Sequence, residues 1–173
     1  MTAKKVSLEA IKALREKTGA SVTDVRNALE SSGGDEAKAL AHLKQRSALL
    51  AEKREGRATG QGRVETYIHH NGRLGAIVEV NCETDFVART EEFIHFCRNV
   101  ALQVAAGSPR YVKTDDAPSG APLSAEEQRE QVLLEQVFIK DPSHTMHDIL
   151  KQLIGKTGEN VVIRRFARFV VGE

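Results

Sequence analysis

A two-residue turn signal between two strand-like runs constrains the fold of this chain more than any other feature. Residues 63–70 and 73–81 are rich in valine, isoleucine, threonine and tyrosine, and Asn71-Gly72 joins them. Asn-Gly supplies the positive φ angles of a type I′ turn, so the pattern predicts a β-hairpin closed by that turn. Residues 161–171 form another strand-like run, which we expect to join the hairpin in a three-stranded antiparallel sheet.

Helical patterns fill the interval between the hairpin and the last strand. Residues 90–106 carry an apolar stripe with a 3.6-residue period, and capping boxes at 124–127 and 145–148 open two more helices. The first of these two helices is expected to carry Val132, Leu133 and Val137. The predicted fold class for residues 63–173 is therefore α+β, in the order β-β-α-α-α-β, with the helices packed on one face of the sheet.

A three-stranded sheet with helices on one face leaves its two edges, and its other face, uncovered. The last strand carries many valines for so small a sheet, namely Val161, Val162, Val170 and Val171. Self-association through the sheet would cover this apolar surface, so a homodimer is predicted.

The first fifty residues are expected to form a separate unit of three short helices. Ser7, Ser21 and Asp35 stand where helix N-caps are expected. Each helix is too short to be stable alone in water, so the three must pack together. We therefore predict a three-helix module over residues 1–50, joined to the core by a glycine-containing linker over residues 51–62.

Composition and missing motifs argue against membrane and enzyme classes. No apolar run is long enough to span a bilayer, and two cysteines give no disulfide framework, so a cytoplasmic protein without a membrane partner is expected. The chain has no G-x-S-x-G motif, no P-loop and no dinucleotide-binding G-x-G-x-x-G after a strand. We expect no catalytic residues, no cofactor and no nucleotide pocket of its own.

One region gathers histidines and cysteines without the spacing of a metal site. Its members are His69, His70, Cys82, His95 and Cys97. There is no C-x-x-C and no H-x-x-x-H pair among them, which are the spacings that zinc sites use. We expect no bound metal.

Nucleic-acid binding is the main alternative function. Basic residues are frequent over 44–57, and residues 164–169 interleave arginine with phenylalanine, as base-stacking sheets do. Alternate residues of a strand face opposite ways, however, so these side chains need not share a surface. The net charge of the whole chain is only +1, so an RNA-binding function is not favoured.

The segment 81–88, Asn-Cys-Glu-Thr-Asp-Phe-Val-Ala, lies where a strand-like run stops and a helix is about to begin. Phe86 stands beside the carboxylate of Asp85 at a junction where chains usually reach the surface. Two readings are open. The ring projects as a wedge that enters a partner, or it folds back into the core.

Several motifs resemble the bacterial elongation factor Ts family, the exchange factors of the translation GTPase elongation factor Tu. Residues 14–20 (LREKTGA) are similar to the N-terminal module of that family. Residues 79–88 (EVNCETDFVA) are similar to its signature around Thr-Asp-Phe-Val. Residues 158–160 and 164–166 also resemble the family, so the likeness extends over nearly the whole chain.

The resemblance implies a guanine-nucleotide exchange factor whose partner is elongation factor Tu, with an N-terminal module of the ubiquitin-associated type. It implies that four residues act in displacing magnesium from the partner: Thr84, Asp85, Phe86 and Val87. It also implies that Arg15 and the start of the second helix dock on the partner's nucleotide-binding domain. Val22 and Thr23 stand there, where many members carry two methionines.

The length of the chain is a further departure from some members. Longer members carry a second core subdomain and a helical hairpin insertion, whereas this chain has one core unit. It resembles the short form, whose members pair to supply two core units. That implication agrees with the homodimer predicted from the uncovered sheet.

Overall fold

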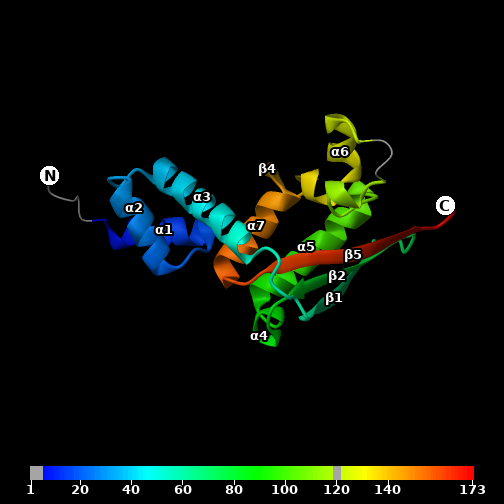
Figure 1. Cartoon of the computed structure of the whole chain (residues 1–173), viewed down its shortest axis with the longest axis horizontal. Coiled ribbons are helices and arrows are strands. Elements are labelled where there is room, and N and C mark those ends of the chain that lie inside the picture. The colour runs from blue at the N-terminus through cyan, green and yellow to red at the C-terminus, as the bar shows by residue number, and fades with distance from the viewer. Residues whose placement is uncertain (1–5, 119–121) are drawn as a thin grey trace.

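The computed structural model describes residues 6–118 and 122–173, which form an N-terminal helical module followed by an α+β core (Figure 1). The predicted fold class is therefore confirmed. Within the two described ranges, no helix combines the length and the apolar character that a membrane crossing requires.

The module consists of α1 (Leu8–Thr18), α2 (Val22–Ser31) and α3 (Glu36–Arg54). The side chains of Ser7, Ser21 and Asp35 cap these helices by accepting backbone N–H groups, as predicted. Gly19 ends α1 with a left-handed φ of 63°, a conformation that favours glycine. The three helices enclose a hydrophobic cluster of their own, made of Ile11, Leu14, Val25, Ala28, Leu29, Ala39 and Leu43.

The main sheet consists of β1 (Gln61–Ile68), β2 (Leu74–Cys82) and β5 (Val161–Val170). All pairs are antiparallel and the order is β1-β2-β5, so the last strand joins the hairpin as predicted. A β-bulge interrupts the pairing of β2 with β5. Glu79 pairs with Arg165 and Val80 with Ile163, which leaves Arg164 as the extra residue of the bulge.

The predicted type I′ turn at Asn71-Gly72 is wrong, although the hairpin itself is present. Gly72 has a φ of 68°, but Ser108 is the only non-glycine residue in the described part of the chain with a positive φ. The backbone N–H of Gly72 donates to the carbonyl of His69 at 2.8 Å. The Asn71 side chain accepts from the N–H of Arg73 at 3.0 Å, and so occupies the donor that a two-residue turn would use.

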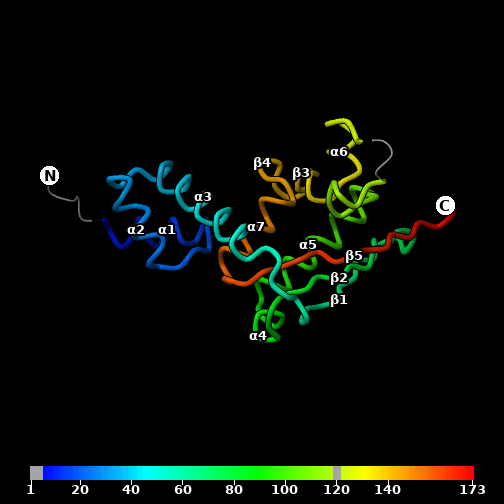
Figure 2. Tube along the Cα trace, in the orientation of Figure 1, coloured from blue at the N-terminus to red at the C-terminus, as the bar shows by residue number. Residues whose placement is uncertain are grey.

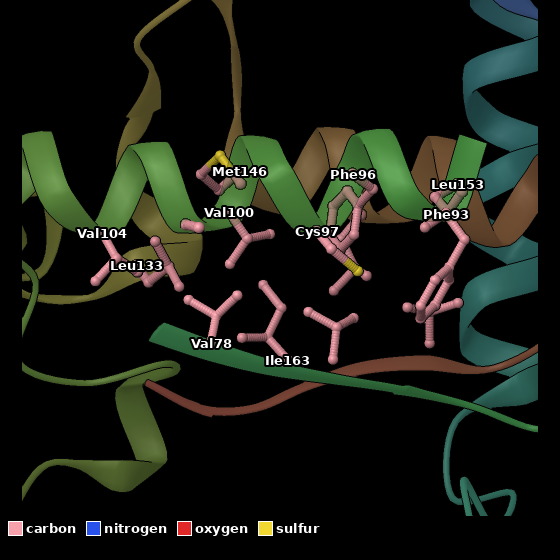
Figure 3. Packing of buried hydrophobic residues seen from close by; sticks show 14 of the residues in the cluster. Val78, Phe93, Phe96, Cys97, Val100, Val104, Leu133, Met146, Leu153 and Ile163 are labelled. Carbon is pink, nitrogen blue, oxygen red and sulfur yellow. The ribbon is translucent and has the colours of Figure 1, made fainter. Parts of the chain in front are cut away.

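Helix α5 (Glu91–Gly107) packs on one face of the main sheet, and α7 (Met146–Thr157) packs beside α5 in the same core. The apolar stripe predicted for α5 is buried. Figure 3 shows Cys97 and Val100 of α5 above Val78 of β2 and Ile163 of β5, with Met146 of α7 behind α5. The shorter helices are α4 (Asp85–Ala88), α6 (Ala125–Gln131) and the 3₁₀ turns η1 (Thr114–Asp116) and η2 (Leu133–Glu135).

A second hairpin, absent from the predicted order, follows η2. It pairs β3 (Val137–Phe138) with β4 (Asp141–Thr145), so the helix expected to carry Val132, Leu133 and Val137 ends earlier, at Gln131. The buried Gln103 side chain accepts from the N–H of Ile139 at 2.9 Å and donates to the carbonyl of Val137 at 3.2 Å. These long-range hydrogen bonds satisfy backbone groups that a helix would have paired locally.

The module contacts the core mainly through α3, which packs against α7 (Figure 2). Gly155 of α7 lies so close to α3 that a Cβ at this position would collide with the side chain of Ser47. The side chain of Lys156 lies across Gly19 in the same manner. Gly155 therefore allows the close approach of α3 and α7, whereas the contact at Gly19 involves only the flexible end of the Lys156 side chain.

Candidate partner-binding site

Phe86 is the most exposed aromatic side chain at the junction between β2 and α5. It lies on α4, which projects at the lower edge of the core in Figure 1. The residue is 80% exposed. Of the two readings of this segment, the structure therefore agrees with a projecting ring and not with a ring folded into the core.

The neighbours of Phe86 explain why its ring points outward. Val87 and Ala88 are half-buried and pack against the main hydrophobic core. Adjacent residues of a helix point about 100° apart, so anchoring Val87 and Ala88 turns residue 86 away from the core. Thr90 then caps α5 by accepting from the N–H of Phe93 at 3.3 Å, and its hydroxyl donates to the carbonyl of Val87 at 2.8 Å.

Asp85 lies half-exposed beside the ring. Its carboxylate pairs with the guanidinium of Arg89 at 2.9 Å, one helical turn later. Both groups are reachable by solvent, so this pair contributes little to stability and its carboxylate can exchange partners at low cost.

Thr84 begins α4 and is held by a residue far away in the sequence. The Thr84 hydroxyl accepts from the N–H of Val87 at 3.4 Å, which caps the short helix. The N–H of Thr84 donates to Glu159 Oε2 at 3.0 Å, and the Thr84 hydroxyl donates to Glu159 Oε1 at 2.6 Å. Nothing in the local sequence pattern around residue 84 pointed to Glu159, which lies in the loop between α7 and β5.

The adjacent thiol is not a reactive group. Cys82 is buried at the end of β2, and its Sγ donates to the carbonyl of Thr84 at 3.1 Å. Burial, together with the nearby carboxylate of Glu159, raises the pKa of the Cys82 thiol to about 11. Burial likewise raises the pKa of the Cys97 thiol to about 12. Both sulfurs therefore stay protonated at neutral pH, as thiols and not as nucleophilic thiolates.

The residues singled out in the module lie on either side of the connection between α1 and α2. Arg15 is exposed in the last turn of α1, and Val22 and Thr23 are exposed in the first turn of α2. Val22 is 52% exposed, which is high for an apolar side chain. This group belongs to the module, apart from α4, so the structure does not bring the two sets of predicted residues together (Figure 2).

The face of the main sheet opposite α5 carries a broad exposed apolar surface. Pairing places Thr66 beside Ile77 and Ile77 beside Ala167, all pointing away from α5. We call this surface the outer sheet face; its exposed large apolar residues are Val64, Ile68, Ile77, Phe169 and Val171. The valine-rich ends of β5 had suggested such a surface, but Val161 is buried and only Val171 of those four valines is largely exposed.

The Arg/Phe strand does not form one stacking platform. Phe166 pairs with Val78 and packs against the core, whereas Phe169 lies on the outer sheet face. Arg165 is paired with Glu79 at 2.7 Å, and Arg168 donates to the carbonyl of Ala105 at 3.1 Å. The side chains that stack on bases in RNA-binding sheets share one surface, which this strand does not offer.

The described residues do not form a metal centre. Within residues 6–118 and 122–173, no three histidine, cysteine, aspartate or glutamate side chains gather closely enough to hold a metal ion. His69 is instead in hydrogen-bond contact with the Tyr67 hydroxyl at 3.0 Å, and its ring lies against that of His70.

Comparison with known proteins gives one consistent result. A family model described as Elongation factor TS matches residues 3–129 of the chain. The elongation factor Ts of Caldanaerobacter subterraneus is 42% identical, over 97% of this chain and 98% of the relative. Those of Rubrobacter xylanophilus (45% identical, 94% of this chain and 97% of the relative) and Thermotoga neapolitana (44%, 97% and 98%) are similar over the same extent.

Proposed function

The chain belongs to the elongation factor Ts family, and from that premise we propose that it is a guanine-nucleotide exchange factor for the GTPase elongation factor Tu. It would act in the cytoplasm. It would need no cofactor and no nucleotide pocket of its own, since it loosens a ligand that its partner holds. No bond is made or broken by the factor, so none of its residues is catalytic.

The exposed ring of Phe86 is the observation that carries this proposal. A GTPase holds GDP through its phosphate-binding loop and through a magnesium ion that bridges protein and phosphate. Magnesium demands near-ideal octahedral geometry, so small shifts of its ligands weaken it sharply. Phe86 would enter the partner near this ion and shift those ligands.

The other three residues of the wedge segment (residues 84–87) would support the ring. Val87 anchors the segment on the core, and Thr84 caps the short helix that presents the ring. Asp85 would exchange Arg89 for hydrogen-bond donors of the partner and so stabilise the displaced arrangement. The weak pairing of two solvent-reachable groups makes that exchange inexpensive.

The module would supply a second contact with the partner. Arg15, Val22 and Thr23 form an exposed group at one end of the three-helix bundle, suited to docking on the nucleotide-binding domain. This contact would hold the GTPase while the wedge segment acts. Smaller side chains at positions 22 and 23 than the methionines of many relatives would give it less apolar area.

Exchange also imposes a thermodynamic condition. The factor must bind the nucleotide-free GTPase more tightly than the GDP-bound form. By reciprocity, GDP and magnesium must then weaken the binding of the factor by the same ratio.

We further propose that the outer sheet face pairs with the same face of a second copy. The apolar residues of this face come from all three strands and are flanked by the Glu79–Arg165 ion pair. Two copies related by a two-fold axis would bury both apolar surfaces in one self-complementary interface. The dimer would then present two wedge segments and two modules.

The experiment that tests the exchange function measures release of a fluorescent GDP analogue from purified elongation factor Tu. Adding the full-length chain at substoichiometric concentration, with unlabelled GDP in excess, should accelerate release by orders of magnitude, because the unlabelled nucleotide displaces each factor molecule and lets it act repeatedly. An unchanged release rate at saturating concentration would refute the function. Salt-dependent retention of RNA without any effect on GDP release would favour the nucleic-acid alternative.

A further inference from the structure

We propose that Glu159 is the positioning residue that sets the wedge segment in place, an inference that rests on the exchange function proposed above. Glu159 lies in the loop between α7 and β5, 75 residues away from Thr84 in the sequence. Its carboxylate receives both hydrogen-bond donors of Thr84, one on each oxygen. It would act on the partner through the geometry of α4 and not by touching the partner.

The hydrogen bonds of Thr84 explain how a distant carboxylate controls Phe86. A threonine hydroxyl has one proton to donate and two lone pairs that accept. Because its proton is committed to Glu159 Oε1, the hydroxyl rotor is fixed with its lone pairs free for the N–H of Val87. The cap of α4 is thus oriented from outside the helix, and a four-residue helix cannot hold itself together.

A second carboxylate, that of Glu83, connects the same two loops, but here the residue 83 side chain accepts from the loop that contains Glu159. The N–H of Asn160 donates to Glu83 Oε1 at 2.7 Å, and Glu83 Oε2 lies 3.5 Å from a guanidinium nitrogen of Arg57. The Asn160 side chain donates to the carbonyl of Arg57 at 2.9 Å. Residues 83–84 and 159–160 therefore bind each other reciprocally, which makes the base of the wedge segment a fixed mount rather than a mobile loop.

The two carboxylates bind different groups, and this difference points to Glu159 as the positioning residue. Glu83 binds the backbone of the other loop, so it holds the two loops together. Glu159 binds Thr84 itself, and Thr84 directly precedes α4. Removing Glu159 would leave the loops joined but free the cap of the helix that carries Phe86.

Two conservative variants of the full-length chain test the role of Glu159. Glu159→Gln keeps the reach of the side chain but loses its charge. Its amide oxygen can still accept from the N–H of Thr84, and its NH₂ group can donate to the Thr84 hydroxyl oxygen, whose second lone pair stays available to the N–H of Val87. Glu159→Asp keeps the charge but is one methylene shorter. If Glu159 positions the wedge, the GDP-release rate at saturating factor should stay within about three-fold of wild type for Gln and fall roughly ten-fold for Asp.

Two readouts separate positioning from other roles. The factor concentration that gives half-maximal release should change less than the maximal rate, because the module still binds. Amide hydrogen exchange at Val87 and Ala88, whose N–H groups bond to Thr84, should be faster in Glu159→Asp, whereas exchange within α1 to α3 should be unaltered. A Gln variant as slow as Asp, or slower, would mean that the negative charge acts directly and would overturn the proposal.

A double-variant cycle adds an independent test. Thr84→Val keeps the shape of the side chain and removes the hydroxyl. If Glu159 acts through this hydroxyl, combining Thr84→Val with Glu159→Asp should slow release by much less than the product of the two single effects. Fully multiplicative effects would contradict the proposal.

The outcome also distinguishes this inference from the function on which it rests. If GDP leaves the partner as fast with the Phe86→Ala variant as with the wild-type factor, the proposed action of the wedge segment is refuted. If Phe86→Ala is slow while Glu159→Asp matches wild type in both rate and amide exchange, only the role of Glu159 is refuted.

Discussion

The outer sheet face and the tip of α4 both expose apolar side chains, but they do so in opposite ways. The outer sheet face is broad, with Ile68 and Phe169 among residues drawn from three paired strands. The tip of α4 offers one ring, Phe86, on four helical residues. The first is held by a hydrogen-bonded ladder, and the second by a few side-chain hydrogen bonds to a distant loop.

This difference suits two kinds of partner. A broad apolar surface costs solubility unless it stays covered, which favours a lasting contact such as a second copy of the chain. A single ring costs little in water and can enter and leave a transient partner, which an exchange factor must do in every cycle. The same chemistry, exposed apolar area, would therefore serve assembly at one place and action at the other.

The strongest test of this comparison is to introduce a charged side chain on the outer sheet face. Ile77→Lys places an ammonium group at the centre of that face, and a symmetric dimer would bury it twice. Because burying an unpaired charge costs several kcal/mol, the dimer dissociation constant should rise roughly a hundred-fold or more. Sedimentation equilibrium measures it, and Leu8→Lys, at an exposed apolar residue of the module, is the matched control. A chain that is monomeric before any substitution would contradict the assembly role.

Removing the ring of Phe86 should have the next largest effect. Phe86→Ala should slow maximal GDP release roughly ten-fold to a hundred-fold, since burying a phenylalanine side chain contributes about 1.5–3 kcal/mol. Phe86→Leu, which keeps most of the apolar volume, should lose less. Sedimentation should show both variants in the wild-type oligomeric state, and a dimer weakened by Phe86→Ala would erase the distinction between the two surfaces.

Disturbing the contact between the module and the core should have a smaller effect, and it should change the binding of the partner more than the maximal rate of GDP release. Gly155→Leu inserts a side chain where Ser47 already lies, and such overpacking costs about 1–3 kcal/mol. The displaced module should raise the concentration for half-maximal GDP release about five-fold to ten-fold with little change in the maximal rate.

A compensating pair tests whether the geometry of this contact is the cause. Gly155→Ala combined with Ser47→Gly restores the space between α3 and α7. It should bring the half-maximal concentration close to that of the wild type. A pair no better than Gly155→Ala alone would show that the module is not positioned through α7.

Acidification should give the smallest effect, on the hydrogen bonds between residues 83–84 and 159–160 that hold the wedge segment. The N–H of Asn160, and secondarily the charge of Arg57, hold the pKa of the Glu83 carboxyl below its usual value of 4.5. A depressed pKa contributes stability above pH 4.5 that is lost as the pH falls through the lower, folded-state value. The amide of Asn160 should therefore be better protected from hydrogen exchange in wild type than in Glu83→Gln at pH 7, and the gap should close on acidification. A gap that widens as the pH falls would refute this.

The elements of this fold that depend on local sequence were predictable. Asn71-Gly72 marks the hairpin, the caps at Ser7, Ser21 and Asp35 mark three helices, and the alternation in residues 161–171 marks the third strand. The turn type was not predictable, because the Asn71 side chain accepts from the N–H of Arg73 and so competes with the two-residue turn. The β3–β4 hairpin was missed because Gln103, more than thirty residues away, satisfies its backbone.

The candidate site divides in the same way. The local pattern at residues 81–88 indicated a projecting or buried ring but could not decide between them, because the answer depends on how Val87 and Ala88 pack against distant residues. The contact between Thr84 and Glu159 joins two loops across 75 residues, and no local signal marks it. Periodicity predicts elements, whereas the side chains that fix a functional segment come from tertiary contacts.

The magnesium dependence of the Phe86→Ala defect tests the central claim most directly. Maximal GDP release from elongation factor Tu would be measured with wild type and with Phe86→Ala, first in millimolar magnesium and then with the metal chelated. If the ring works by displacing the ion, the roughly ten-fold to hundred-fold advantage of wild type should shrink to near parity without magnesium. An advantage of the same size in both conditions would contradict the account.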